Sequence, residues 1–332
     1  MTRLFALLML IGMVMLQAVV ATRADQPAAA ALKKATLALL WLPQAQFSGY
    51  YVALDKGIYR RHGIDLTILP GGPGRSPADA LRDGQADFAL LWLGTALQRR
   101  AAGLPIVNVA QIVQRSSLVL VARKAAGIET VADLAGRKVG LWGDDLAVAP
   151  RAFLDRHGVT VQPVPQSETV NLFLRGGVDV ASAMWYNEYH TILNAGVDAD
   201  ELTVFRLGSD GLNIPEDGLY TLTATLARDP ALVDGFVRAT LEGWQDAIAN
   251  PEQALDIVLA RMREAKLPAD RVHQKWMLSC LAEVIRPSGA DAVTGELGRS
   301  DLDALVAELQ RTALLRAPIG YDDFVRPIDA AR

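Results

Sequence analysis

Cysteine is almost absent from this chain of 332 residues, which contains only Cys280. A single cysteine forms no intrachain disulfide and no cysteine-based zinc cluster. Cys280 lies in an apolar helical run, where a buried inert thiol is expected. The four histidines are scattered and match no metal-binding spacing. The G-x-S-x-G motif that carries a nucleophilic serine is missing as well. We therefore predict no catalytic residues, no metal site and no cofactor.

An excess of positive charge is also missing. The chain has 33 Lys and Arg against 37 Asp and Glu, a net charge of −4, and no long basic run. Proteins that bind nucleic acid need a concentrated cationic patch for the phosphates, so that class is excluded. The composition is 51% apolar and 21% charged, as in folded proteins. At roughly 150 residues per domain, the length predicts about two domains.

The first 24 residues differ from the rest of the chain. Arg3 gives a short positive start, residues 4–20 carry no charge, and small residues follow up to Ala24. This pattern predicts a secretory signal peptide at residues 1–24, with cleavage after Ala21 or Ala24. An uncleaved membrane anchor is the alternative, because the uncharged run approaches the length of a membrane span. No cysteine lies near the cleavage point, so we expect a protein exported to the periplasm without a lipid anchor.

Short apolar runs alternate with amphipathic stretches between residues 35 and 226. Strands are expected at 35–41, 64–69, 87–92, 106–113, 117–123, 138–142, 159–165, 178–185, 202–207 and 219–226. Helical periodicity fills the gaps between them, and this alternation is typical of βαβ units with a mostly parallel sheet. From residue 229 to 315 the pattern is almost wholly helical.

The alternation divides twice, which predicts an α/β protein of two lobes, each with a mostly parallel sheet, and a helical C-terminal part. The first lobe is expected at 33–121 and 222–332, and the second at 122–221. Hinge crossings are expected near 121–125 and 218–221, as short extended segments.

Aromatic residues make up only 6% of the chain, but their placement is uneven. Four of the six tryptophans fall at the carboxyl ends of expected strands: Trp41, Trp92, Trp142 and Trp185. Ligands of open α/β sheets bind beyond these strand ends. Because each lobe supplies two of the rings, we expect a cleft walled by indole on both sides, which suits a planar ligand. The alternative is that the rings close the sheet ends as part of the core.

Further ligand contacts are expected from residues close to these tryptophans. They are Gln46, Phe47, Tyr50, Gln114, Tyr186, Asn187, Glu188 and Tyr220. A carboxylate in a dry aromatic cleft needs a partner, and an amine or amidine edge of a ligand would supply one to Glu188. The alternative for Glu188 is a solvated residue at a helix N-terminus.

The glycine-rich turn at 70–76 is a weaker signal. It has neither a P-loop nor a dinucleotide-binding pattern, and a tight connection with a helix cap at Ser76 is the simpler interpretation. If the ligand were a small anion, this turn and Arg115 would be expected to hold it.

Several longer segments are similar to a known family. They are WLPQAQFSGYYVA (41–53), DKGIY (55–59), GIDL (63–66), GQADF (84–88), LAGRKVGLW (134–142) and WYNEY (185–189). Together they resemble the thiamine-pyrimidine-synthase-like family of substrate-binding proteins, over about residues 36–225.

The resemblance implies a type II periplasmic-binding-protein fold whose two lobes close on a small solute and deliver it to an ABC permease in the inner membrane. It implies a thiamine pyrimidine precursor as ligand, of the formylaminopyrimidine or hydroxymethylpyrimidine type. Trp41 and Tyr186 would stack on the ring, and Glu188 would accept from its exocyclic amine. Wider relatives bind sulfonates, nitrate or other small molecules, so an anion binder stays open.

Fungal relatives are enzymes that form the pyrimidine, using a cysteine-rich run and a histidine near the first-lobe cleft. This chain has one cysteine, and residues 93–102 contain no histidine, so that activity is not expected here. We expect a monomeric binding protein rather than an enzyme.

Overall fold

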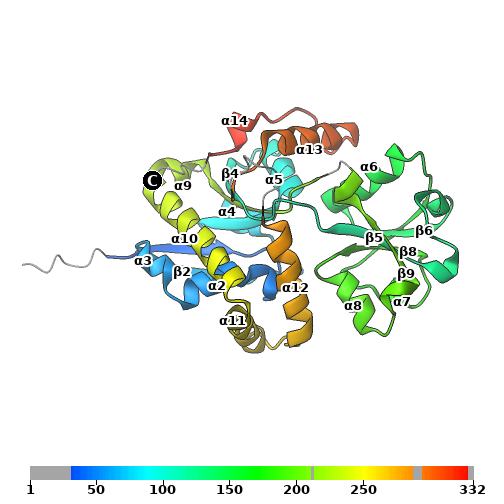
Figure 1. Ribbon diagram of the computed structural model, residues 1–332. Coiled ribbons are helices and arrows are strands. Elements are labelled where there is room, and N and C mark those ends of the chain that lie inside the picture. The colour runs from blue at the N-terminus through cyan, green and yellow to red at the C-terminus, as the bar shows by residue number, and fades with distance from the viewer. Residues whose placement is uncertain (1–30, 211–212, 287–293, 328–332) are drawn as a thin grey trace, which may run out of the picture.

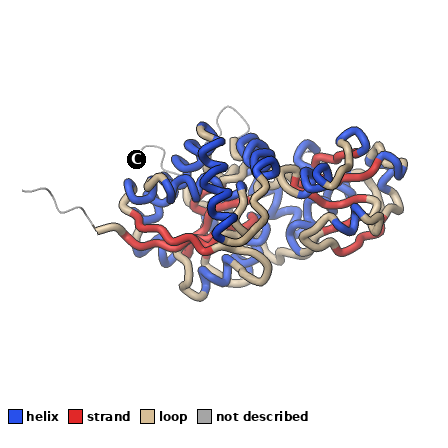
Figure 2. The backbone as a smooth tube through the Cα atoms, turned by 90° about the horizontal axis from the view of Figure 1, so that it is seen from below, coloured by secondary structure: helices blue, strands red, loops and turns tan. Residues whose placement is uncertain are grey.

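The computed structural model describes residues 31–210, 213–286 and 294–327, so the expected signal peptide at 1–24 lies outside the described residues. Two five-stranded sheets with flanking helices form two lobes that lie side by side (Figure 1). Seen from below, the strands gather in two separate groups with helices around each (Figure 2). The expected two-lobed α/β fold is therefore confirmed.

The sheet of the first lobe has the order β2-β1-β3-β10-β4. Its strands are β1 (Lys33–Ala38), β2 (Ile64–Leu69), β3 (Phe88–Trp92), β4 (Ile106–Gln111) and β10 (Asp217–Leu222). β1 pairs in parallel with β2 and β3, whereas β10 runs antiparallel to both β3 and β4. β4 is buried at every position, as is expected of a strand with helices on both faces.

The second lobe repeats this plan with the order β7-β6-β8-β5-β9. Its strands are β5 (Leu118–Arg123), β6 (Lys138–Leu141), β7 (Gln162–Pro165), β8 (Val180–Met184) and β9 (Leu202–Arg206). β6 is parallel to β7 and β8, and β5 is antiparallel to β8 and β9. Each sheet thus has one antiparallel strand among parallel ones, and "mostly parallel" describes both.

The chain passes between the sheets twice. The first crossing is residues 112–117, between β4 and β5, and the second lies between the end of β9 at Arg206 and the start of β10 at Asp217. The sheets therefore change a few residues before the expected crossings near 121–125 and 218–221, which fall within or directly after β5 and within β10. The physical reason is that β5 and β10 begin as soon as the chain has crossed, and both are buried strands. Their apolar pattern looks the same whichever lobe they join.

Most helices belong to the first lobe. They are α2 (Ser48–Asp55), α3 (Ile58–Arg61), α4 (Pro77–Arg82), α5 (Leu93–Ala101), α9 (Thr223–Arg228), α10 (Pro230–Ala249), α11 (Pro251–Glu264), α12 (Arg271–Val284), α13 (Arg299–Arg311) and α14 (Tyr321–Phe324). The second lobe has α6 (Val148–Arg156), α7 (Asn171–Leu174) and α8 (Glu188–Asn194). Single turns of 3-10 helix include η1 (Ala45–Phe47), η2 (Lys124–Ala126), η3 (Val131–Leu134), η4 (Asp144–Ala147), η5 (Ala199–Glu201) and η6 (Leu207–Asp210). α12 runs down the boundary between the lobes (Figure 1).

Two close approaches fix the helical layer over the first sheet. Phe88 of β3 and Phe236 of α10 stack with ring centroids 3.9 Å apart. At Gly243 of α10, an added Cβ would meet the carbonyl oxygen of Gly49 in α2 at 2.3 Å, so these two helices touch backbone to backbone. Cys280 is buried in α12, and burial raises the pKa of its thiol to about 12, which keeps it neutral as expected.

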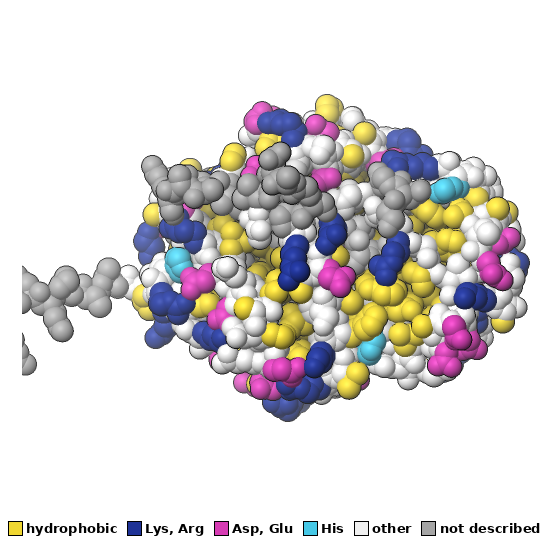
Figure 3. All heavy atoms as spheres, viewed as in Figure 1, with side chains coloured by type: hydrophobic (Ala, Val, Ile, Leu, Met, Phe, Trp, Pro, Cys, Tyr) yellow, Lys and Arg dark blue, Asp and Glu magenta, His cyan; other side chains and the backbone are white. Residues whose placement is uncertain are grey.

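The face of the molecule in Figure 3 carries Lys, Arg, Asp and Glu side chains interspersed, with no continuous patch of one sign. Among the described residues, no helix is both long enough and apolar enough to cross a membrane.

Candidate functional site

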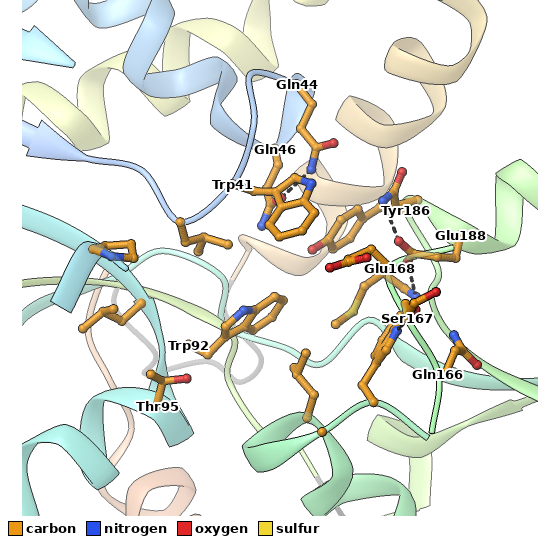
Figure 4. A pocket seen from close by; sticks show the side chains of 18 of the residues that line it. Trp41, Gln44, Gln46, Trp92, Thr95, Gln166, Ser167, Glu168, Tyr186 and Glu188 are labelled. Carbon is orange, nitrogen blue, oxygen red and sulfur yellow. Dashed lines mark hydrogen bonds between the residues drawn. The ribbon is translucent and has the colours of Figure 1, made fainter. Parts of the chain in front are cut away.

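A pocket of about 440 Å³ lies between the two lobes, beyond the carboxyl ends of strands from both sheets (Figure 4). The first lobe lines it with Leu40, Trp41, Gln44, Gln46, Ser76, Pro77, Leu91, Trp92 and Thr95. The second lobe lines it with Trp142, Gly143, Leu146, Gln166, Ser167, Glu168, Met184, Tyr186, Asn187 and Glu188. The site is thus where the strand-end argument predicts a ligand cleft.

Three indole rings enter the pocket because of where the strands end. Trp41 lies in the loop after β1, Trp92 is the last residue of β3, and Trp142 directly follows β6. All three are half-buried. The Trp142 ring is held by a hydrogen bond that its Nε1 donates to the carbonyl oxygen of Ser167, at 3.0 Å. The pocket therefore offers flat apolar faces from both lobes.

Two glutamines connect the pocket wall to a buried acid. Gln44 donates from Nε2 to Oε1 of Gln46 at 2.7 Å, and Gln46 donates from Nε2 to Oδ2 of Asp217 at 2.7 Å. Asp217 is the first residue of β10, and its side chain is buried with Oδ1 lacking a partner among the described residues. Burial raises the pKa of Asp217 to about 7, although the hydrogen bond from Gln46 acts in the opposite direction.

The neighbouring acid Glu216 links the two crossings. Its carboxylate accepts from the backbone N–H of Ser117 at 2.6 Å and from the Ser117 hydroxyl at 2.8 Å. Burial raises the pKa of Glu216 to about 8, and the nearby Asp217 adds to this shift. Two protonatable carboxyl groups thus lie side by side in sequence at the end of the second crossing.

Glu188 faces the pocket from the first residue of α8. Its Oε2 accepts from the backbone N–H of Met184 at 2.9 Å, and its Oε1 accepts from Nδ2 of Asn187 at 2.7 Å. A carboxylate has about four acceptor positions, so capacity for a ligand donor remains. Burial raises the pKa of Glu188 to about 7. Burial also raises the pKa of Tyr186 well above its usual value, which keeps its hydroxyl a donor.

Most of the residues that the sequence singled out line this pocket. They are Trp41, Gln46, Trp92, Trp142, Tyr186, Asn187 and Glu188. That they contact a ligand stays a prediction. Gln44, which the sequence places between Trp41 and Gln46, joins them.

The other four expected contact residues lie outside the pocket. Phe47 and Tyr50 are buried in the core, because η1 and α2 turn them away from the pocket that Trp41 faces; Tyr50 packs edge-on against Trp244 at 5.9 Å. Tyr220 points from β10 to the core and packs against Phe324 at 5.9 Å. Gln114 is buried in the first crossing, where its amide bonds the Gln111 carbonyl oxygen.

Trp185 also turns away, contrary to the expectation of four converging tryptophans. Its ring stacks on Tyr189 at 4.1 Å, and the Arg206 guanidinium lies 3.8 Å from the ring centroid. Tyr186 follows Trp185 directly in the turn after β8. Of the two rings, that of Tyr186 lines the pocket.

The anion-binding alternative finds little support in the pocket. Ser76 and Pro77 of the glycine-rich turn do line it, but the Ser76 hydroxyl caps α4 by accepting from the backbone N–H of Asp79 at 3.2 Å. Arg115 lies elsewhere and bonds the carbonyl oxygen of Glu283. The described residues that line the pocket include Glu168 and Glu188 but no Lys, Arg or His.

Comparison with known proteins shows which family this chain belongs to. The family model described as "NMT1/THI5 like" matches residues 44–254. The chain belongs to this family. The match confirms the resemblance that the sequence segments indicate.

Two relatives and one solved structure are informative. The chain is 31% identical over 246 residues to the riboflavin-binding protein RibY of Chloroflexus aurantiacus, covering 71% of this chain and 68% of that protein. It is 26% identical over 290 residues to the formylaminopyrimidine-binding protein of Halalkalibacterium halodurans, covering 82% and 86%. The periplasmic aliphatic sulphonate-binding protein SsuA of Escherichia coli shares the fold, with a TM-score of 0.70 at 17% identity over 90% and 94% of the chains.

Sequence reasoning missed several pocket residues, including Thr95, Gln166, Ser167, Glu168 and Met184. Gln166, Ser167 and Glu168 follow β7, Met184 ends β8 and Thr95 lies in α5, and no local pattern distinguishes these positions. The buried pair Glu216 and Asp217 had a usable signal, since two consecutive acids stand at the start of an otherwise apolar strand.

Proposed function

We propose that this protein is the periplasmic solute-binding component of an ABC importer and that it captures a planar nitrogen heterocycle between its lobes. One observation carries the proposal: Trp41 and Trp92 from one lobe, and Trp142 and Tyr186 from the other, line a single pocket whose charged side chains are acidic. Flat aromatic faces favour a flat ligand, because stacking adds to burial at little ordering cost. Acidic and amide acceptors favour a ligand edge that donates hydrogen bonds.

A thiamine pyrimidine precursor fits this description. An aminopyrimidine has a flat ring and an exocyclic amine, and the amine would donate to Glu188 while the ring stacks on Trp41 or Tyr186. The similarity to a protein named for formylaminopyrimidine binding supports this choice.

A flavin is the second candidate, and two observations favour it. The relative named for riboflavin binding is 31% identical, and the pocket of about 440 Å³ lies in the range of roughly 300–1,000 Å³ that drug-sized ligands occupy. A three-ring ligand would use all three indoles at once, whereas a single pyrimidine ring would contact fewer of them.

A sulfonate or another small anion is disfavoured despite the shared fold. An anion in this pocket would face Glu168 and Glu188 with no cationic side chain from the described lining residues. Burying an unpaired charge next to carboxylates is costly. We also propose binding without turnover, because both carboxylate oxygens of Glu188 already accept hydrogen bonds, from the Met184 backbone N–H and the Asn187 amide.

Capture would work through the two crossings. The described connections between the sheets are residues 112–117, 207–210 and 213–216, and rotation there would open and close the cleft. Closure would trap the ligand and present a changed surface to a permease in the inner membrane. The expected signal peptide at 1–24 would direct the protein to the periplasm. We propose that the mature protein is a monomer there.

A thermal-shift panel tests the ligand class. Riboflavin, hydroxymethyl-aminopyrimidine and formylaminopyrimidine are compared with taurine, an alkanesulfonate and nitrate, each at the same concentrations. A ligand at 100 times its Kd stabilises a protein by about 2.7 kcal/mol, which is easily detected. We expect stabilisation by at least one heterocycle and none by the anions. Stabilisation by the sulfonate alone would refute the proposal.

A further inference from the structure

α12 carries two side chains from the first lobe onto α8 of the second. α12 is fixed to the first lobe, since Oε1 of Gln274 accepts from the backbone N–H of Ala45 at 2.7 Å. Its last carbonyl, that of Val284, accepts from the backbone N–H of Gln114 at 2.9 Å, at the first crossing. On its other side, His273 and Trp276 contact residues of the second lobe.

His273 reaches the acid in the pocket through one intermediate residue. Its Nε2 lies 2.9 Å from Oδ1 of Asn187, and Nδ2 of Asn187 donates to Oε1 of Glu188 at 2.7 Å. An ionised carboxylate only accepts, so the Asn187 amide nitrogen must face Glu188 and its oxygen must face His273. The proton of neutral His273 is therefore on Nε2, and His273 is the donor.

The second nitrogen of His273 is held by another residue of α8. Nδ1 of His273 lies 2.9 Å from Nδ1 of His190. Nδ1 of His190 also lies 3.2 Å from Nδ2 of Asn194, so Asn194, His190 and His273 form one chain of contacts. The His190 ring stacks on Trp276 at 5.0 Å, and Nε1 of Trp276 donates to the Trp185 carbonyl oxygen at 3.0 Å. The imidazole of His273 is thus fixed on both sides.

We propose that His273 is a positioning residue that couples closure of the lobes to the binding geometry of Glu188. The inference rests on the proposed function, because it assigns a role in ligand binding. His273 precedes Val284 by eleven residues in one helix, which places it about 16 Å along the helix axis from the crossing. Rotation at the crossing therefore moves His273 away from Asn187. Only in the closed arrangement does His273 hold the Asn187 amide, which in turn orients the Glu188 carboxylate.

This role explains a contact that the pocket alone does not. The half-buried carboxylate of Glu188 accepts hydrogen bonds from two donors of the protein. One donor, the Met184 N–H, comes from the lobe of Glu188 itself. The other, the Asn187 amide, is oriented by a side chain from the opposite lobe. The affinity of the pocket is then linked to closure through one hydrogen-bonded chain.

Calorimetry with riboflavin and with hydroxymethyl-aminopyrimidine as probes tests the inference on the full mature chain. We expect His273→Ala to weaken binding about tenfold, which corresponds to one lost hydrogen bond. His273→Gln keeps an amide N–H for Asn187 and is expected to recover most of the affinity. In an Asn187→Ala background, His273→Ala is expected to have no further effect. His62→Ala is the matched control, because His62 pairs with Glu242 on the first lobe away from the pocket.

The possible failures are distinguishable. If wild type binds a probe and His273→Ala binds it equally well, the inference is wrong and the proposed function stands. The same holds if His273→Ala weakens binding by the same factor in the Asn187→Ala background as in wild type. If wild type binds neither probe and does not bind formylaminopyrimidine either, the proposed function is wrong and the inference falls with it. Should His273→Ala unfold, the same comparison is made with His273→Leu and His273→Gln, and equal affinity of these two overturns the inference.

Discussion

Gln46 donates a hydrogen bond from its Nε2 to Oδ2 of Asp217 at 2.7 Å, and Asp217 is only 3% exposed. This pair links the wall of the pocket to the start of β10, where the chain has just returned to the first lobe. Burial raises the pKa of Asp217 to about 7, so the carboxyl group changes its charge near neutral pH. The stability of the protein should depend on pH for this reason.

Stability should fall as the pH rises through neutrality. The pKa of Asp217 is about 7 in the folded protein and roughly 4 in the unfolded chain, so the folded state binds more protons between these values. The stabilisation is complete below the unfolded pKa and is lost as the pH rises through the folded one. Glu188 and Glu216, whose pKa values are also raised, contribute in the same direction. Thermal unfolding at pH 5, 7 and 8.5 should show a falling Tm.

Asp217→Asn should make this dependence weaker, since the amide cannot ionise and its oxygen still accepts from Gln46. Asp322→Asn, at a surface side chain that is 84% exposed, is the control and should keep the wild-type slope. A wild-type Tm that rises over the same range, or an Asp217→Asn slope equal to that of wild type, would contradict the assignment.

Removal of a single indole should weaken ligand binding. Trp41→Ala and Trp142→Ala each remove one stacking face, and we expect a loss of about 1–3 kcal/mol in binding free energy. Trp244→Phe is the control, because Trp244 is buried against Tyr50 outside the pocket and should affect stability only. The measurement is calorimetric titration with whichever heterocycle wild type binds. Unchanged affinity in both pocket variants would show that the rings do not hold the ligand.

Binding of an amine-bearing ligand should strengthen with pH around neutrality. Glu188 ionises as the pH rises through its raised pKa of about 7, and the ionised form is the better acceptor for a neutral donor. Affinity should therefore increase between pH 6 and pH 8. Glu188→Ala should lose about 1–3 kcal/mol and most of this dependence. An affinity that is flat with pH in wild type, or a Glu188→Ala variant that still shows the increase, would rule out this role.

The packing of α10 on α2 gives a prediction for stability alone. Gly243→Ala would place a Cβ 2.3 Å from the Gly49 carbonyl oxygen, and we expect a loss of about 1–3 kcal/mol in the free energy of unfolding. Gly235 is in the same helix, but its added Cβ would have only ordinary contacts from 3.4 Å outward. Gly235→Ala should stabilise by about 0.5–1 kcal/mol through helix propensity. Urea unfolding measures the free energy of unfolding of both variants. An equal change in the two would contradict the close contact at Gly243.

The sequence was sufficient for the two-lobed α/β fold because strands and helices have different apolar periods. It also located Trp41, Trp92 and Trp142, because a ligand cleft lies where parallel strands end. It did not separate Trp185 from Tyr186, since a one-residue change of register at the end of β8 decides which ring faces the pocket. Phe47 and Tyr50 do not line the pocket, because η1, which ends at Phe47, and α2 turn both side chains into the core.

Long-range contacts were the other limit. The hydrogen bonds from Gln46 to Asp217 and from Asn187 to His273 join residues far apart in sequence. No local pattern encodes such pairs. A related reason applies to the strands at the crossings, since β5 and β10 join their sheets without any change in composition.

Native mass spectrometry and absorbance of the mature protein purified after export identify the small molecule that copurifies with it. We expect a planar nitrogen heterocycle that is released on unfolding, is bound again on titration and is retained more weakly by Trp142→Ala. A sulfonate or other non-aromatic anion retained in its place would show that the protein does not bind a heterocycle.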